Sequence, residues 1–128
     1  MKKIITTKNA PAPIGPYNQA VLSGNTLYIS GQIPVDPATG EIVSGGIDAE
    51  AKQVMNNLKA ILEEAGLTFE NVVKSSIFLS DMGDFSAVNT VYATYFNEKT
   101  APARETVEVA NLPKYVTLEI SMIAVKDL

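Results

Sequence analysis

Arg104 is the only arginine among the 128 residues, and it is the side chain best suited to hold an anionic ligand. Its guanidinium is planar and permanently charged, and it can bind a carboxylate or phosphate through two parallel hydrogen bonds. All other basic side chains are lysines, which lack this forked geometry. The segment Ala101 to Val109 therefore contains a candidate anion-binding residue, with a structural ion pair as the alternative role.

The residue types that are missing limit the chemistry further. The chain has no histidine, cysteine or tryptophan, so it lacks the commonest general base, the thiol nucleophile and the soft metal ligands. Asp81 and Asp84 stand close together, but two carboxylates are far too few for a calcium loop. No metal and no organic cofactor is expected. Any reaction must use Arg104, carboxylates, hydroxyls, phenols, amides and the backbone.

Glu119 is the carboxylate with the most favourable surroundings for proton transfer. In a strand over residues 116–125, alternation places Glu119 on the same face as Thr117, Ser121, Ile123 and Val125. Apolar neighbours raise the pKa of a carboxyl group, which is what a group that both accepts and returns a proton requires. A glutamate in solvent or in an ion pair is the alternative.

Four further positions could contribute to a site. Tyr17 follows the rigid Ile14-Gly15-Pro16 loop, which would hold its hydroxyl at a fixed point, although a packing role is the alternative. Ser30 and Gly31 close a strand, and Gly31 would let a ligand approach the backbone unless it only bends the strand. Asn89 is placed on the core side of a helix, where its amide needs partners that could be structural.

The composition is that of one folded domain over residues 1–128, with 46% hydrophobic and 19% charged residues. A net charge of −4 argues against general binding to nucleic acid or to an anionic membrane, since both require a basic face. No run approaches the roughly 18 apolar residues of a membrane span. The absence of cysteine suits a reducing compartment, so a cytoplasmic location is expected.

The elements that must position these residues can be read from the hydrophobic pattern. Apolar or alternating runs predict six strands, over residues 2–7, 20–22, 26–30, 72–80, 104–109 and 116–125. Apolar residues at helical spacing predict a helix over 49–65, capped by Asp48 and ended by Gly66 in a left-handed conformation, with Leu67 folding back onto its last turn. A second helix is predicted to begin at Asp84, which caps it, and to end at about Asn97.

The order β-β-β-α-β-α-β-β indicates an α+β fold in which two helices cover one face of a mixed sheet. Side-chain alternation places three residues on one face of the fourth strand, Val73, Ile77 and Leu79. Helical spacing places four residues on the core side of the second helix, Phe85, Val88, Tyr92 and Phe96. The last strand is apolar on one face and still carries Ile123 and Val125 on the other. A sheet that is apolar on both faces needs a second cover, so we expect self-association.

At these residues the chain resembles the Rid (YjgF) family of reactive-intermediate deaminases, and it is most similar to the RidA branch. The resemblance covers nearly the full length. It is concentrated in Ala10 to Tyr17, in Ser30-Gly31-Gln32-Ile33-Pro34, and in the blocks from Pro102-Ala103-Arg104 through Val107 to Pro113 and on to Leu118-Glu119-Ile120. The family implies a chorismate-mutase-like fold and a homotrimer with a central barrel of sheets and clefts between subunits.

The resemblance also implies a reaction, the hydrolysis of 2-imino acids and their enamine tautomers to 2-keto acids and ammonia. The implied substrates are 2-iminobutanoate and 2-iminopropanoate, which arise from serine and threonine dehydratase chemistry. Carried onto this chain, Arg104 would bind the substrate carboxylate and Glu119 would direct water and move its proton. Tyr17 and Asn89 would line the cleft, while Ser30 and Gly31 would place polar groups around the substrate.

Two neighbours of Arg104 depart from the RidA pattern. Thr106 stands where that branch commonly has cysteine, and Glu105 stands where a small residue is typical. The Thr106 backbone N–H is still expected to contact substrate, so these changes bear on rate or preference. Three other functions remain open: a regulator that binds a metabolite without turnover, a ribonuclease, which the acidic charge disfavours, and a holdase for unfolded proteins.

Overall fold

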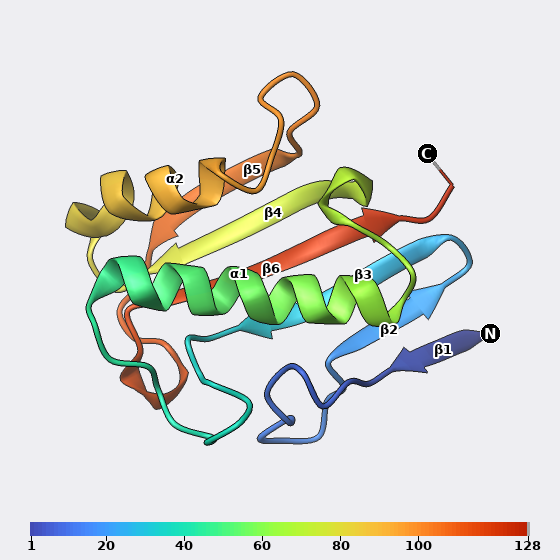
Figure 1. Ribbon diagram of the computed structural model, residues 1–128, viewed down its shortest axis with the longest axis horizontal. Helices are drawn as coiled ribbons and strands as arrows, with labels where there is room; N and C mark the ends of the chain where they lie inside the picture. The colour runs from blue at the N-terminus through green and yellow to red at the C-terminus, as the bar shows by residue number, and fades with distance from the viewer. Residues whose placement is uncertain (128) are drawn as a thin grey trace.

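The computed structural model describes residues 1–127, which form one six-stranded sheet with two helices lying across one of its faces (Figure 1). The strands are β1 (Lys2–Ile5), β2 (Ala20–Ser23), β3 (Thr26–Gln32), β4 (Val72–Leu79), β5 (Ala103–Glu108) and β6 (Leu118–Val125). The helices are α1 (Ile47–Glu64) and α2 (Phe85–Ala93), and short 3-10 turns are η1 (Phe69–Asn71), η2 (Met82–Asp84) and η3 (Pro113–Tyr115). This confirms the predicted α+β class and element order.

The sheet order is β1-β2-β3-β6-β4-β5, so the last strand in sequence lies at the centre. β4 and β5 are parallel and are joined by the crossover that contains α2, while every other neighbouring pair is antiparallel. The sheet is therefore mixed, as predicted. Because β6 pairs with both β3 and β4, it brings Glu119 next to the end of β3.

Helix α1 supplies much of the core. Its buried face includes Val54, Met55, Leu58, Ile61 and Leu62, all 0% exposed. The predicted end is confirmed: Gly66 has φ 77, and the N–H groups of Gly66 and Leu67 donate to the carbonyls of Glu63 and Leu62. The predicted cap is wrong, because the helix begins two residues earlier than expected and Asp48 lies inside its first turn, with Gly46 at the cap position.

Two other local predictions are also wrong. The pairing of β4 with β6 shifts register between Val72 and Lys74, so Val72 takes the buried position and Val73 points outward with 37% exposure. Helix α2 ends at Ala93, earlier than the predicted Asn97. Asp84 does occupy the N-cap position of α2, as predicted, but its side chain makes no capping bond. Asp81 accepts from the Gly83 N–H and caps η2. The alternation and the apolar pattern did not reveal a bulge or a 3-10 turn.

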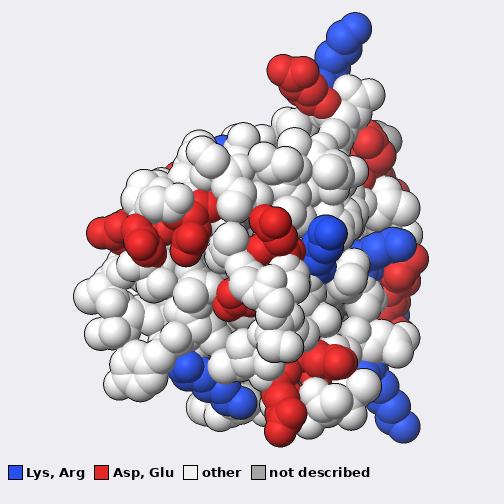
Figure 2. Space-filling model, turned by 60° about the vertical axis from the view of Figure 1, so that its left-hand side comes forward, with Lys and Arg blue, Asp and Glu red and all other residues white. Residues whose placement is uncertain are grey.

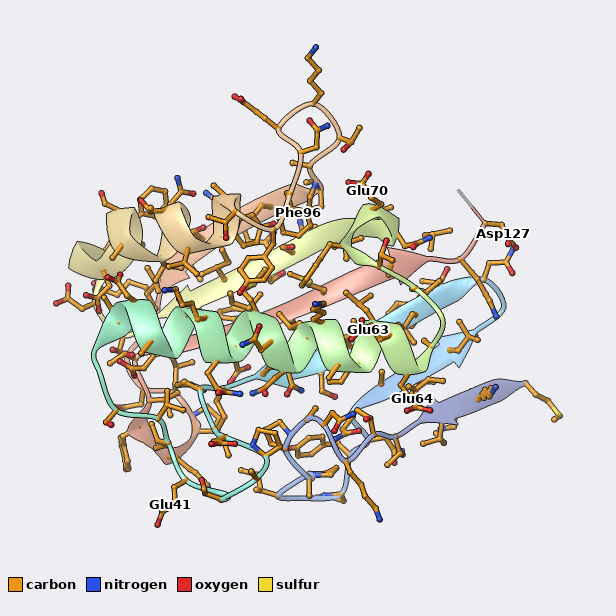
Figure 3. The ribbon with its side chains drawn as sticks, in the orientation of Figure 1. Glu41, Glu63, Glu64, Glu70, Phe96 and Asp127 are labelled. Atoms are coloured by element: carbon orange, nitrogen blue, oxygen red, sulfur yellow. The ribbon has the colours of Figure 1, made fainter. Side chains whose placement is uncertain are left out.

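The aromatic residues beyond α2 close one end of the core. Phe96 contacts Tyr92 and Phe69, with ring centroids 4.7 and 5.3 Å apart, although it lies after the last helical turn. Figure 3 shows Phe96 between the end of α2 and the η1 turn, above the sheet. Val88 and Tyr92 are buried as predicted, whereas Phe85 is 37% exposed. The core-side prediction for Phe85 is therefore wrong.

The two faces of the sheet are unequal. On the helix side, Leu118, Ile120, Met122 and Ala124 of β6 are buried. On the open face, Glu119, Ser121, Ile123 and Val125 are half-buried, and the neighbouring Tyr28 and Val107 are 51% and 40% exposed. Within residues 1–127, none of the helices has the length and apolar character that crossing a membrane requires.

Candidate active site

Arg104 lies on β5 at the edge of the sheet, where α2 presents three residues to it. Its Nη1 donates to Asn89 Oδ1 at 2.8 Å, and its Cζ lies 5.0 Å from the Tyr92 ring centroid and 5.7 Å from that of Phe85. Phe85, Asn89 and Tyr92 are four and three residues apart and so share one helical face. The guanidinium is thus held by an amide and two aromatic faces.

Within residues 1–127, Arg104 does not form the structural ion pair that was its alternative role. Among residues 1–127 the sole ion pair joins Lys74 Nζ to Glu105 Oε1 at 2.6 Å, and Arg104 takes no part in it. Asn89 satisfies one donor of the guanidinium, which has five. The remaining donors are available to a ligand. Asn89 is exposed, so its predicted position on the core side of α2 is wrong, although the structure does bring it to Arg104.

Thr106 follows Arg104 on the same face of β5. Its Oγ1 is buried and is the one such side-chain oxygen or nitrogen, within the described chain, that has no hydrogen-bond partner. Buried polar atoms are nearly always paired, so an orphaned one calls for an explanation. Here it lies two residues along the strand from the free donors of Arg104.

Glu105, which points to the open face, has a different role. It pairs with Lys74 and accepts a hydrogen bond from the Ser76 hydroxyl. The hydrogen bond from Lys74 is the main reason that the pKa of Glu105 is lowered, with Ser76 contributing next. Glu105 is therefore engaged with β4 and does not neutralise Arg104.

Glu119 belongs to a second group of residues on the open face. It lines a cavity of about 330 Å³ together with Ile14, Tyr17, Ser30, Gly31, Ile33 and Pro113. Burial raises the pKa of the Glu119 carboxyl, as the sequence predicted from its apolar neighbours. The cavity thus holds a carboxylate whose protonated form is favoured more than usual.

Gly31 determines how close Glu119 can come to β3. A Cβ atom added at Gly31 would lie 2.7 Å from Cδ and 2.9 Å from Cγ of Glu119, closer than side chains pack. The register of β3 against β6 shifts between Ile29 and Gln32, so Ser30 and Gly31 occupy an irregular stretch that turns toward Glu119. Glycine is needed here for the close approach of the Glu119 side chain, and the ligand contact expected at Gly31 stays a prediction.

Tyr17 and Ser30 are placed at the same cavity by hydrogen bonds to the preceding loop. The Tyr17 hydroxyl accepts from the Ile14 N–H at 3.2 Å. The Ser30 hydroxyl donates to the Asn18 carbonyl at 2.6 Å, and the Ser30 N–H donates to the Gln19 carbonyl at 2.9 Å. Both donors of Ser30 are therefore used within the chain, so its hydroxyl can contribute to a ligand contact only as an acceptor.

The two groups lie on opposite faces of the sheet. Arg104 is the register partner of Ser75, which is buried under the helices, and Glu119 is the partner of Phe78. Because successive residues of a strand point to opposite faces, positions 75 and 78 of β4 face opposite sides. One copy of the chain therefore contains an arginine half-site with Asn89 and Thr106, and a glutamate half-site with Tyr17, Ser30 and Gly31. It does not bring Arg104 to Glu119.

Sequence reasoning missed several residues of the two half-sites. Phe85 and Tyr92 pack on the guanidinium of Arg104, and their spacing from Asn89 on α2 was the signal that could have linked all three to one ligand. Ile14, Ile33 and Pro113 line the glutamate cavity, but they come from three separate loops. Within the described residues, no group of three or more acidic side chains is arranged to hold a metal ion.

Comparison with known proteins places this geometry in a family. The sequence model described as Endoribonuclease L-PSP matches residues 7–126. A protein from Bos taurus named 2-iminobutanoate/2-iminopropanoate deaminase is 52% identical over 126 residues, covering 98% of this chain and 91% of that protein.

Solved structures agree with this placement. The crystal structure of a putative endoribonuclease from Thermotoga maritima has a TM-score of 0.96 at 49% identity and covers 100% of both chains. A protein of unknown function of the conserved Rid protein family from Yersinia pestis has a TM-score of 0.94 at 46% identity, with 98% of this chain and 99% of that one covered.

Proposed function

The chain belongs to the Rid family, whose sequence model carries the description Endoribonuclease L-PSP, and from this membership we propose that it hydrolyses reactive 2-imino acids to 2-keto acids and ammonia. The family placement and the named deaminase among its relatives support imine deamination in general. The proposal adds the substrates, 2-iminobutanoate and 2-iminopropanoate, and the residues that act on them.

The observation that carries the proposal is the state of Arg104. Its guanidinium is fixed by Asn89 and two aromatic rings, and it has no carboxylate partner within residues 1–127. An oriented arginine with free donors fits the carboxylate of a 2-imino acid. A hydrogen bond to a charged group contributes roughly 1.5–3 kcal/mol, so a two-pronged contact would fix the substrate firmly.

Glu119 is suited to the proton transfers of this reaction. The ionised carboxylate removes a proton from water as the water oxygen attacks C2, which gives a carbinolamine. Glu119 returns that proton to the nitrogen, so that the carbinolamine carries a hydroxyl and an amino group on C2. Glu119 then takes the hydroxyl proton and passes it to the same nitrogen, and the C–N bond breaks with its electron pair going to the leaving ammonia as the carbonyl of the 2-keto acid forms. Burial raises the pKa of Glu119, which favours the return of the proton.

Thr106 and the glutamate cavity would complete the contacts to substrate. The buried Thr106 Oγ1 lacks a partner, and a substrate oxygen or a bound water beside Arg104 would supply one. Tyr17 and Gly31 line the cavity at Glu119, where Gly31 leaves room next to the carboxylate. Ser30 contributes an acceptor, since both of its donors are used.

The site is proposed to form in a cleft between two copies of the chain, within a homotrimer. Arg104 and Glu119 occupy opposite faces of one sheet, so a single copy cannot direct both at one substrate. The open face carries half-buried Ile123 and Val125 with the exposed Tyr28 and Val107, which is an apolar surface that another sheet could cover. Because Arg104 lies on the edge strand β5, placing that edge of one copy beside the open face of the next would bring the two half-sites together.

The experiment that tests the proposal generates 2-iminobutanoate in place with a threonine dehydratase and follows ammonia release. Wild type should accelerate release, and Arg104→Lys should lose about 10²-fold or more, since lysine cannot form the two-pronged contact. Size-exclusion chromatography and thermal unfolding would check that the variant keeps its fold and assembly. Full activity of Arg104→Lys would remove the carboxylate contact from the mechanism.

The same experiment separates the competing functions. If wild type gives no acceleration yet butanoate raises its melting temperature through Arg104, the cleft binds metabolites without turnover and the regulator is correct. The family description also raises a ribonuclease. On the face shown in Figure 2 the basic side chains are interrupted by acidic ones, and the net charge is −4, which disfavours RNA binding. Cleavage of RNA that disappears in Arg104→Lys would reverse this preference.

A further inference from the structure

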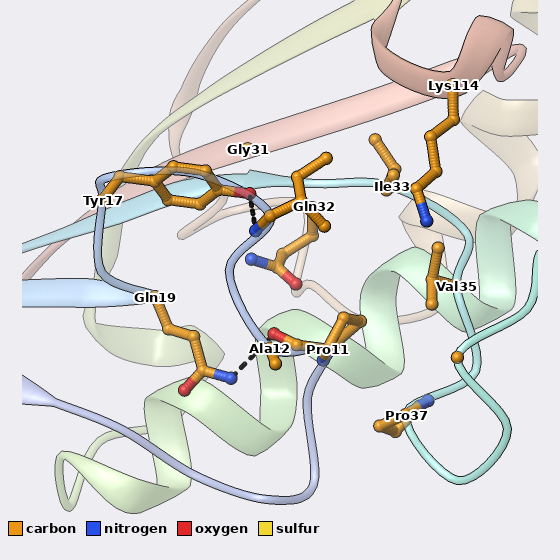
Figure 4. Close-up of a pocket in the computed structure, with 12 residues that line it drawn as sticks. Pro11, Ala12, Tyr17, Gln19, Gly31, Gln32, Ile33, Val35, Pro37 and Lys114 are labelled. Atoms are coloured by element: carbon orange, nitrogen blue, oxygen red, sulfur yellow. Dashed lines mark hydrogen bonds between the residues drawn. The ribbon is translucent and has the colours of Figure 1, made fainter.

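A second cavity lies beside the glutamate half-site, and Tyr17 lines both. It measures about 220 Å³ and is shown in Figure 4. Ile14, Tyr17, Gly31 and Ile33 border both this cavity and the one at Glu119. Its remaining wall is formed by Pro11, Ala12, Gln19, Gln32, Val35, Pro37, Gly40 and Lys114. Neither Glu119 nor Arg104 is part of it.

The charge of this wall is unusual for so acidic a protein. The chain has 14 acidic side chains, yet Lys114 is the sole charged residue among those that line the cavity. Lys114 forms no ion pair within residues 1–127. In Figure 4 its side chain extends from η3 toward the segment with Val35 and Pro37. A cationic group therefore borders a small cavity with no carboxylate in the wall to neutralise it.

The backbone at Lys114 holds this arrangement under strain. Lys114 and Tyr115 have φ values of 56° and 55°, the left-handed region that residues with a Cβ rarely adopt, and they are the non-glycine residues of the described chain that do so. The Tyr115 N–H donates to the Leu112 carbonyl at 2.8 Å and stabilises the turn. Such conformations persist where the surrounding structure imposes them, often at ligand sites.

The remaining wall combines an apolar surface with two fixed amides. Gln19 is 2% exposed, and its side chain donates to the carbonyls of Thr7, Ala10 and Pro11, which anchors the loop with Pro11 and Ala12. Gln32 is 5% exposed and donates to the Ser30 carbonyl. In Figure 4 its amide lies between Tyr17 and the Pro11–Ala12 segment. Proline, isoleucine and valine side chains provide the apolar part of the wall.

From this cavity we infer that the protein has a second small-molecule site, which binds a short-chain aliphatic carboxylate. Lys114 pairs with the carboxylate, the Gln32 amide adds a hydrogen bond, and Ile33, Val35 and Pro37 contact the aliphatic chain. The cavity volume of about 220 Å³ is below the roughly 300–1,000 Å³ of sites for drug-sized ligands, which suits a small ligand such as a five-carbon acid.

A ligand bound in this cavity would also alter the wall of the glutamate cavity. The wall between the two cavities consists of Ile14, Tyr17, Gly31 and Ile33, and Tyr17 is held only by local contacts, its hydroxyl to the Ile14 N–H and its N–H to the Gly15 carbonyl. A ligand that contacts Tyr17 from one side changes the surface that a substrate would contact from the other. The binding claim itself does not depend on the proposed deaminase activity.

The test titrates 3-methylbutanoate into ¹⁵N-labelled protein and follows the side-chain amide signals of Gln32 and Gln19. The background is Arg104→Lys, which disables the other candidate carboxylate site. We expect saturable shifts of both amides in this background. Adding Lys114→Gln should weaken binding at least about tenfold, because it removes a charge-assisted hydrogen bond. Ala12→Leu, which adds bulk to the wall, should also abolish the shifts.

Two controls make the result specific. Lys52→Gln, an exposed residue of α1 outside the cavity, changes net charge by the same amount and should leave the affinity unchanged. The uncharged 3-methylbutanamide should bind more weakly than the acid and should not distinguish Lys114→Gln from its parent. Equal affinity of the acid for Lys114→Gln and parent, or no shift of the Gln32 amide up to the solubility limit, would overturn the inference.

Discussion

Glu119 shows how a single residue acquires its chemistry from its neighbours. Its position between β3 and β4, on the half-buried face of β6, raises its pKa through loss of solvation. Gly31 permits this position, because any side chain there would collide with the carboxylate. The burial that suits a proton carrier also destabilises the folded protein when the carboxyl group is charged. Function and stability therefore oppose each other at this residue.

The pH dependence of stability should carry the signature of Glu119. Because its folded-state pKa is raised, the folded protein binds a proton more tightly than the unfolded chain does, and stability falls as pH rises through the folded-state pKa. Thermal unfolding of wild type and Glu119→Gln should therefore give similar melting temperatures near pH 4. At pH 7 the glutamine variant should be the more stable of the two.

Turnover should move in the opposite direction. The water-activating carboxylate must be ionised, so wild-type kcat/KM should fall as pH drops through the raised pKa, and Glu119→Gln should be slow at every pH, by about 10²-fold or more at neutrality. Glu64→Gln, at an exposed position of α1, serves as the matched control. A glutamine variant with the wild-type pH profile would exclude Glu119 from proton transfer.

At the scale of elements, α2 and the β3–β6 pair each build one half of the site. Helix α2 presents Phe85, Asn89 and Tyr92 to Arg104, and its short length leaves Phe96 free to pack on Phe69. The irregular end of β3 turns Gly31 toward Glu119. Helix α1 contacts the site less directly, through Asn57. This fully buried side chain donates to the carbonyls of Ile33 and Val35 and so holds the loop that follows β3.

The end of α1 offers a test of an element independent of the chemistry. Gly66 has φ 77, and nothing lies within 4 Å of the position that a Cβ would occupy, so Gly66→Ala should cost only backbone strain, about 1 kcal/mol. This corresponds to a fall of about 4 °C in melting temperature. Gly66→Asn, which tolerates the left-handed region better, should lose less. Imine turnover at 25 °C should be unchanged in both; a neutral Gly66→Ala would contradict the assigned helix end.

At the scale of the whole molecule, the decisive feature is that the two half-sites face away from each other across one sheet. The helices cover the face with Arg104, and the open face with Glu119 keeps exposed apolar side chains. If the β5 edge of one copy lies beside the open face of the next, each cleft combines the arginine half-site of one copy with the glutamate half-site of the next. The homotrimer remains a proposal, and the cytoplasmic location remains a prediction.

Mixing two inactive variants tests the shared cleft directly. When Arg104→Lys and Glu119→Gln chains are refolded together in equal amounts, each cleft receives an intact arginine from one copy and an intact glutamate from the next with a probability of about one quarter, which follows from random assembly of a closed ring. Activity should therefore return to about a quarter of wild type. Each variant refolded alone is the control. No recovery in the mixture would mean that both residues act within one copy.

The sequence alone determined the element order, the apolar face of α1 with its end at Gly66, and the alternation of Arg104, Thr106 and Glu119 along their strands, because these depend on local periodicity and backbone preference. It also identified Arg104 and Glu119, but it missed the packing of Phe85 and Tyr92 on Arg104 and the residues that reach the glutamate cavity from separate loops. Four features depend on the tertiary fold: the bulge at Val73, the exposure of Asn89, the lack of an ion-pair partner for Arg104 within residues 1–127, and the cavity beside Lys114. Each of these depends on contacts between residues distant in the sequence. Local pattern shows which face a residue occupies, but strand order and packing determine what lies opposite it.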